Sequence, residues 1–204
     1  GGRAGHHPLK LVGDPRVFAP CGEIPAAALI ATGATASRAP GRPDPANGAA
    51  VSEAIAVAVR ACLNGDAAAL VTAPIHKAVM AAGGFAFPGH TEYLAHLTGA
   101  RRAVMMLASD KLRVVPLTIH MPIAQVPGAV TKQVVFETGE IIVTALRRDF
   151  GILNPRLAVA GLNPHAGEEG LLGPEDATII APAVAALRAR GFAVTGPLSA
   201  DTLF

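Results

Sequence analysis

Residues 156–167 read RLAVAGLNPHAG, and residues 112–122 read LRVVPLTIHMP. Each stretch begins as a short apolar run, typical of a β-strand, and stops at a loop bounded by Pro or Gly that carries one histidine. In an open α/β sheet, ligands bind in the crevice at the carboxyl ends of the strands. We therefore predict strands over 156–162 and 112–119, with His165 and His120 at the same edge of the sheet. Imidazoles placed there can bind a divalent metal, polarise a carbonyl or transfer a proton, although two separated histidines alone favour a structural role.

Strands and helices alternate through most of the chain. The helical spacing of apolar residues and the capping signals predict helices over 49–63, 75–82, 90–97, 131–150 and 174–190. Apolar runs predict further strands over 9–13, 67–72, 103–108 and 192–197. The runs 103–108 and 112–119 are close enough to form an antiparallel hairpin, and the Pro- and Gly-rich segment 34–47 is predicted to be a surface loop. The pattern indicates an α/β fold with a mainly parallel sheet and flanking helices.

The composition excludes several classes of protein. A length of 204 residues suits one domain or two small ones, and the net charge of +2 comes from interspersed charges, which argues against nucleic-acid or charged-membrane binding. Cys21 and Cys62 are far apart in the sequence and form no CxxC motif. This suggests neither a disulfide framework nor a thiolate metal site, and we expect both thiols to be reduced. The sequence has no unbroken apolar run of about 18 residues, and no hydrophobic signal core at its start, so we expect a cytoplasmic protein. It also lacks the glycine motifs of Rossmann and P-loop proteins and the serine-hydrolase motif.

Two further positions combine turn residues with chemistry. His90 and Thr91 stand at a predicted helix start after Pro88 and Gly89, where free backbone N–H groups attract a phosphate or carboxylate. The alternative, favoured by these residues alone, is that Thr91 caps the helix. Lys77 follows the predicted strand 67–72 and either meets an anion or lies on a helix surface.

The loop NPHAGEEG, residues 163–170, combines an amide, an imidazole and two carboxylates. A functional site and an ordinary surface turn are equally compatible with it. Asp201 follows the strand 192–197 and is a candidate partner for a metal or for proton transfer. His96 is expected to be a surface or packing residue, and no function is expected for His6 and His7.

Six stretches of the chain resemble, in the same order, the 4-hydroxythreonine-4-phosphate dehydrogenase (PdxA) family. They are ACLNGDAAALVTAPIHK (61–77), FPGHTEYLA (87–95), VMMLAS (104–109), LTIHMP (117–122), GLNPHAGEEG (161–170) and GPLSADTLF (196–204). Together they span nearly everything from Ala61 onward, and GHTE with GLNPHAGE is a specific combination.

The resemblance implies an isocitrate/isopropylmalate-dehydrogenase-like fold and a homodimer with its active site at the subunit boundary. It implies NAD-dependent oxidation of 4-phosphohydroxy-L-threonine followed by decarboxylation, with a divalent ion (Zn²⁺, Mg²⁺ or Co²⁺) held by three histidines. His120 and His165 match two of these metal ligands, and His90 and Thr91 match a substrate-binding pair. Asp201 matches a catalytic acidic position near the metal.

The resemblance also implies that residues 1–204 are a partial catalytic region. The family begins with a Gly/Pro-rich segment and continues past ADTLF, where it carries the third histidine, further substrate-binding residues and most of the nicotinamide site. We therefore expect these 204 residues to be inactive alone. Two other functions remain open: a related dehydrogenase of four-carbon sugar-acid phosphates or cyclic dihydrodiols, and a non-catalytic dimeric domain that binds a phosphorylated ligand or a metal.

Overall fold

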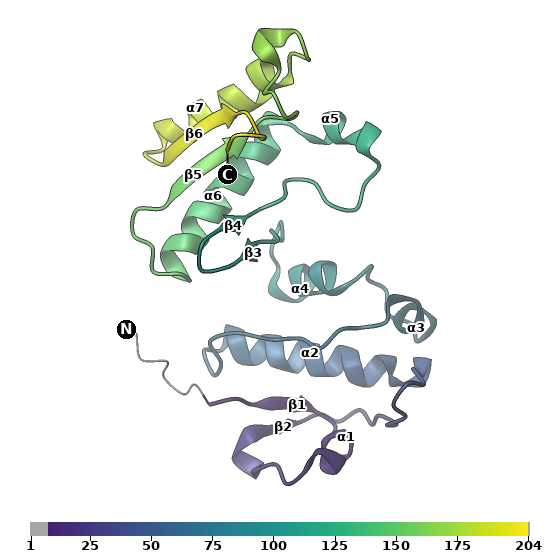
Figure 1. The fold of residues 1–204 in the computed structure, drawn as a ribbon. Helices are drawn as coiled ribbons and strands as arrows, with labels where there is room; N and C mark the ends of the chain where they lie inside the picture. The colour runs from purple at the N-terminus through teal and green to yellow at the C-terminus, as the bar shows by residue number, and fades with distance from the viewer. Residues whose placement is uncertain (1–7, 204) are drawn as a thin grey trace. The chain divides into compact units, whose positions relative to one another are not determined.

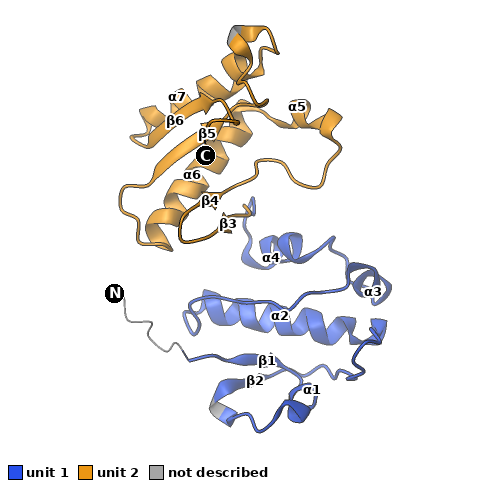
Figure 2. Cartoon of the chain, in the orientation of Figure 1, with its two compact units in different colours: residues 1–103 blue, residues 104–204 orange. Residues whose placement is uncertain are grey.

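The computed structural model describes residues 8–203, except for the side chains of Ala27 and Glu169. The chain divides into two compact units, one up to Ala103 and one from Val104 (Figure 2). Each unit combines helices with a pair of parallel strands, so the predicted α/β class is confirmed at this level. His6 and His7 lie outside the described residues.

The first unit is built on strands β1 (Leu11–Gly13) and β2 (Leu29–Ala31), which pair in parallel. Helix α2 (Gly48–Leu63) lies along β1 (Figure 1) and buries Ile55, Ala58 and Val59. Its bounds confirm the predicted helix 49–63. The other helices of this unit are α1 (Pro15–Phe18), α3 (Lys77–Ala82) and α4 (His90–Thr98). Short 3₁₀ turns occupy Ala19–Cys21, Ala26–Ala28 and Pro45–Asn47.

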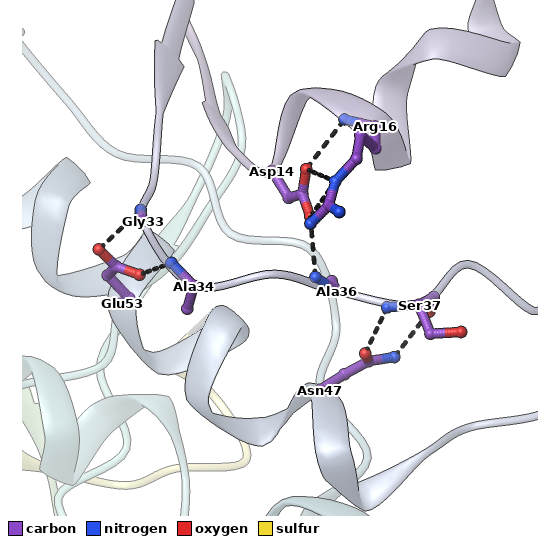
Figure 3. A network of polar contacts seen from close by, with 8 residues as sticks. All are labelled: Asp14, Arg16, Gly33, Ala34, Ala36, Ser37, Asn47 and Glu53. Atoms are coloured by element: carbon purple, nitrogen blue, oxygen red, sulfur yellow. Dashed lines mark hydrogen bonds and ion pairs between the residues drawn. The ribbon is translucent and has the colours of Figure 1, made fainter.

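Asp14 joins the end of β1 to the segment that follows β2 (Figure 3). Its carboxylate caps α1 by accepting the Arg16 backbone N–H at 3.0 Å, and it accepts the Ala36 N–H at 2.8 Å. The Arg16 guanidinium donates to the same carboxylate at 2.6 Å. This bond, with the two backbone bonds, holds the pKa of Asp14 well below its usual range. The buried carboxylate is therefore fully charged at neutral pH and fixes the predicted surface loop.

Glu53 makes a second link between this loop and α2 (Figure 3). Its carboxylate accepts the N–H of Ala34 at 2.6 Å and that of Gly33 at 3.0 Å, and these bonds lower its pKa. Asn47 exchanges two 2.8 Å bonds with the backbone of Ser37.

By length and composition alone, Pro45–Leu63 would also suit a membrane span. Since Glu53 binds loop amides from its middle and one face packs on β1, we interpret α2 as a core helix.

The predicted strand over 67–72 is wrong. Residues 67–72 form no strand, and Val71 is 92% exposed. A short apolar run becomes a strand only when a partner backbone supplies its hydrogen bonds, and no pairing partner is recorded for this run within residues 8–203. Helix α3 starts at Lys77, later than predicted, because the His76 ring nitrogen Nδ1 caps it by accepting the Val79 N–H at 3.4 Å.

The second unit is built on strands β5 (Arg156–Ala160) and β6 (Ala193–Leu198), also parallel. Helices α6 (Lys132–Arg148) and α7 (Ala181–Ala189) contact each other, and α7 packs on β6 (Figure 1). A π-helical turn, Asp176–Ile180, leads into α7. The core between them is fully buried at Val143, Val184 and Leu187. These elements confirm the predicted order of helix, strand, helix and strand.

The predicted hairpin forms, but its strands are much shorter than expected. β3 (Leu107–Ala108) pairs antiparallel with β4 (Arg113–Val114), whereas strands over 103–108 and 112–119 were predicted. Pro116 has no N–H to donate to a ladder, so the strand stops before it. His120 therefore follows a loop rather than a strand end. The α5 helix (Val126–Ala129) comes next, and short 3₁₀ turns occupy Ile123–Gln125 and Glu168–Gly170.

Across residues 8–203 the strands form three separate two-stranded sheets, two parallel and one antiparallel. The single mainly parallel sheet predicted from the sequence is thus present only as separate pairs. In the second unit, an open cavity of about 700 Å³ lies between the 111–118 segment, α6 and β5. Its walls are mostly Val, Leu and Ile side chains, so this unit exposes apolar surface beside its strands.

Candidate functional site

The histidine-bearing loop after β5 is closed by its own asparagine. Asn163 Oδ1 accepts the N–H of His165 at 2.9 Å and that of Gly167 at 3.2 Å. The Asn163 amide also donates to Leu172 O at 3.3 Å. A short polar side chain that bonds its neighbours' backbone is a common way to stabilise a tight turn. Asn163 thus sets the direction in which the chain carries His165 away from the strand.

A buried carboxylate holds the start of the same loop. Asp176, which is 5% exposed, accepts the Leu162 N–H at 2.9 Å. Beside it, a Cβ on Gly161 would lie 2.8 Å from Ala166 Cα, so only glycine lets the loop fold back on the strand end. Ala166 itself adopts the left-handed region with φ of 49°, a conformation that side chains other than Asn and Asp adopt rarely. Asp176 was not predicted from the sequence, although an acid in the first turn after Pro174 was a usable signal.

The segment after β6 lies against this loop. Ser199 Oγ donates to Pro164 O at 2.7 Å, and the Ala200 N–H donates to the same oxygen at 3.0 Å. Next to these bonds, His165 Nδ1 and Asp201 Oδ2 are 3.6 Å apart, and both side chains are about half exposed. The structure therefore brings together two of the predicted site residues, one from the end of each strand of the parallel pair.

The His165–Asp201 separation is that of an ion pair, and it is also close to the spacing of two ligands on one metal ion. At 3.6 Å the two atoms are too far apart for a good hydrogen bond. Two donors on one tetrahedral zinc ion, each at about 2.0–2.1 Å, lie about 3.4 Å from each other. Imidazole nitrogen and carboxylate oxygen are both ordinary ligands of such ions. The pair therefore has the donor chemistry and spacing of two ligands of one divalent ion.

A complete metal site is not present in the described part of the chain. Residues 8–203 contain no group of three or more His, Cys, Asp or Glu side chains that could hold an ion. His120 is exposed and adopts a left-handed backbone with φ of 53°. That it shares an ion with His165 remains a prediction.

The predicted anion site lies in the first unit, at the start of α4. Helix α4 begins at His90 with Gly89 as its N-cap, and no side chain caps it. The alternative in which Thr91 caps the helix is therefore wrong. Thr91 is exposed, and its hydroxyl is not used in capping. Lys77 reaches this helix start: its Cε and Nζ lie 3.4 and 3.7 Å from the position of a Cβ on Gly89. The Glu92 carboxylate lies at the same place, with Oε2 3.5 Å from that position, so the helix start holds a cation, free N–H groups and a side-chain anion of its own.

An aromatic cluster fixes the position of α4. The Tyr93 ring packs on Phe85 and Phe87 at 5.0 and 4.9 Å, and Phe87 also meets the ring of His96 at 5.0 Å. The Tyr93 hydroxyl donates to Ser52 O on α2 at 3.1 Å, and burial raises the pKa of Tyr93. The expectation that His96 is a packing or surface residue is confirmed. The Nε2 atom of His90 is buried, and no hydrogen-bond partner for it lies within residues 8–203.

Comparison with known proteins assigns the family. The sequence pattern of the family described as pyridoxal phosphate biosynthetic protein PdxA matches residues 14–204. The chain belongs to the PdxA family. Curated members named 4-hydroxythreonine-4-phosphate dehydrogenase include one from Paracoccus denitrificans, 48% identical across 97% of this chain and 66% of its own length. Another, from Sodalis glossinidius, is 47% identical across 94% of this chain and 57% of its own length.

Solved structures agree with the PdxA assignment. A 4-hydroxythreonine-4-phosphate dehydrogenase from Klebsiella pneumoniae superposes with a TM-score of 0.79 at 40% identity, covering 87% of this chain and 55% of that one. A terephthalate 1,2-cis-dihydrodiol dehydrogenase from Burkholderia xenovorans gives 0.72 at 29% identity, covering 94% and 65%. The chain thus spans between about half and two thirds of the length of these PdxA relatives.

Proposed function

We propose that this PdxA-family chain is a portion of an NAD-dependent, metal-requiring dehydrogenase that oxidises 4-phosphohydroxy-L-threonine in pyridoxal phosphate synthesis. The product of that oxidation is a β-keto acid, which then loses CO₂. The observation that carries the proposal is the His165–Asp201 pair, 3.6 Å apart on the GLNPHAGEEG loop and the segment after β6. This activity belongs to the whole protein, of which the chain supplies a part.

His165 and His120 are proposed as ligands of the divalent ion, and Asp201 as the acidic group beside it. Bound there, the ion would polarise the substrate hydroxyl, while NAD would accept the hydride. Asp201 would act as the acidic group near the ion and exchange a proton beside His165. The loop bonds of Asn163 fix the backbone at His165 and Gly167, which lowers the entropy lost when the loop binds a ligand.

The start of α4 is proposed as the phosphate site. Thr91 would supply a hydroxyl, the helix N–H groups and Lys77 a positive charge; because its Nε2 is buried, His90 would bind through Nδ1. A phosphate ester carries the oxygens that such donors bind. We further propose an isocitrate/isopropylmalate-dehydrogenase-like fold for the whole protein, a homodimer, and a cytoplasmic location.

A chimera tests this function. Residues 14–204 would replace the matching segment of the Paracoccus denitrificans relative, and NADH formation would be followed with 4-phosphohydroxy-L-threonine and Zn²⁺, Mg²⁺ or Co²⁺. We expect turnover by the chimera, loss of turnover with His165→Ala, and none from the 204-residue chain alone. A well-folded chimera that reduces no NAD would contradict the proposal, and turnover by the chain alone would contradict the need for the rest of the protein.

A second candidate is favoured by one comparison. The Burkholderia xenovorans neighbour is named as a dihydrodiol dehydrogenase, so the same chimera should be offered a cyclic cis-dihydrodiol. Turnover of the dihydrodiol but not of the phosphate ester would favour this substrate class. Binding of both metal and phosphate ester without NADH formation would favour the non-catalytic domain instead.

A further inference from the structure

The start of α4 presents two side chains of opposite charge to one open position. A Cβ on Gly89 would lie 3.7 Å from Lys77 Nζ of α3 and 3.5 Å from Glu92 Oε2 of α4. Both are ordinary van der Waals distances, so no side chain fills the position that glycine leaves empty. A ligand group placed there would contact a cation and a carboxylate at once.

These two charges are not neutralised by other side chains. Lys77 and Glu92 are both exposed, and in the described part of the chain, residues 8–203, neither makes an ion pair or a side-chain hydrogen bond. A carboxylate in the first turn stabilises a helix through its dipole, which accounts for Glu92 in part. The same carboxylate repels a ligand that is only anionic, but it attracts one that also carries a positive group.

We propose that Lys77 and Glu92 select a zwitterionic phosphate ester, with Lys77 binding the phosphate and Glu92 binding an ammonium group of the same molecule. The inference rests on the proposed function and deepens it, because 4-phosphohydroxy-L-threonine carries an α-ammonium group on the carbon chain that bears its phosphate. A four-carbon sugar-acid phosphate has a hydroxyl in its place, and a cyclic dihydrodiol has no ammonium group. In this assignment, Glu92 distinguishes the amino-acid ester from the other two substrate classes.

The test measures binding by calorimetry on the full chain, rather than turnover. It compares 4-phosphohydroxy-L-threonine with 4-phospho-D-threonate, which has the same carbon chain but a hydroxyl where the first ligand has its ammonium group. Hydrogen bonds between charged groups are strong, although water weakens exposed ones. We therefore expect the amino-acid ester to bind about 10-fold more tightly, a difference of about 1.4 kcal/mol.

Charge variants then assign this preference to one residue. Glu92→Gln should weaken binding of the amino-acid ester about 10-fold and leave the sugar-acid ester unchanged or slightly tighter. Glu92→Asp keeps the charge and should retain part of the preference. Lys77→Met should weaken both esters, because both carry the phosphate. Asp66→Asn is the matched control, since it removes one negative charge from an exposed position elsewhere in the first unit and should change neither affinity.

The outcomes separate this inference from the proposed function. If neither ester binds the unchanged chain, the phosphate site itself is wrong, and the selection fails with it. If both esters bind equally well, the phosphate site stands and only the selection is wrong. The selection also fails if Glu92→Gln weakens both esters equally, as loss of helix stability would, or tightens both, as removal of a merely repulsive charge would. Circular dichroism of each variant confirms that the proteins compared are folded.

Discussion

Leu187 of α7 packs so closely on Gly139 of α6 that a methyl group on Gly139 would lie 2.5 Å from Leu187 Cδ1. Leu187 is fully buried and cannot move aside without disturbing the core. Two effects oppose each other in Gly139→Ala. Helix propensity favours alanine by about 1 kcal/mol, whereas overpacking a core costs about 1–3 kcal/mol. We expect the overlap to dominate and the variant to be less stable in urea unfolding.

The sign of this effect should reverse when Leu187 is shortened. Leu187→Ala alone should lower stability by about 2–5 kcal/mol. In that background, Gly139→Ala meets open space and should become neutral or stabilising. Gly128→Ala in α5 is the matched control, since no atom lies within 4 Å of its added Cβ. Equal effects of Gly139→Ala in both backgrounds would show that the two residues are not coupled.

The carboxylates of Asp14 and Glu53 should make the first unit sensitive to acid. Hydrogen bonds lower the pKa of both groups in the folded state. As pH falls, the unfolded chain therefore binds more protons than the folded one. The contribution of both groups, fully present above about pH 5, falls progressively below that pH and is still falling at pH 3. Stability curves in urea between pH 3 and 7 should show this loss, and Asp14→Asn with Glu53→Gln should flatten it. If the double variant loses as much stability on acidification as the unchanged chain, these two carboxylates are not its cause. Asp110→Asn in the β3–β4 hairpin serves as control.

Thr91 and Lys77 should contribute to anion binding without supporting the fold. Because Gly89 is the N-cap of α4, Thr91→Ala should leave helix content unchanged by circular dichroism. Its affinity for a phosphate ester should fall about fivefold, the effect of one hydrogen bond of about 1 kcal/mol. Lys77→Met should also weaken binding and reduce its dependence on salt. Thr98→Ala, at the other end of α4, is the control; an unchanged affinity in Thr91→Ala would remove Thr91 from the site.

The apolar cavity of the second unit should make the chain self-associate. Exposed apolar patches promote association, and we expect light scattering to give a dimer or larger species instead of the 20.6 kDa monomer. Leu112 lines the cavity and is 48% exposed, so Leu112→Lys should weaken association. Ile123→Lys is the control, since Ile123 is 89% exposed but does not line the cavity. A stable monomer at high concentration would contradict the expectation.

The sequence predicted long helices well and short strands poorly. Repeated apolar spacing placed α2 and α6 within a few residues of their observed bounds, since a long period is a strong local signal. The run 67–72 looked equally convincing as a strand, yet forms none, because strand formation depends on a partner elsewhere in the chain. Strand β2, only three residues long, was missed for the same reason.

The sequence predicted which residues lie at the site, but not the contacts that hold them in place. His165 and Asp201 were identified from their places after strands, and the structure puts them 3.6 Å apart. Ser199 and Asp176 make contacts between distant segments, which no local pattern encodes. His120 was expected at a strand end, but Pro116 stops the ladder before the chain reaches it.

The close approach of Gly161 and Ala166 limits which mutations this region can accept. Any side chain at position 161 would push away the backbone that carries His165. Substitutions at position 161 and substitutions within the loop therefore affect each other. Libraries that aim to change substrate choice should keep glycine at 161 and a small residue at 166. They have more freedom at Leu171 and Leu172, which are exposed and distant from the strand end in sequence. Selection for a new substrate would then act on the rim of the loop and leave its base unchanged.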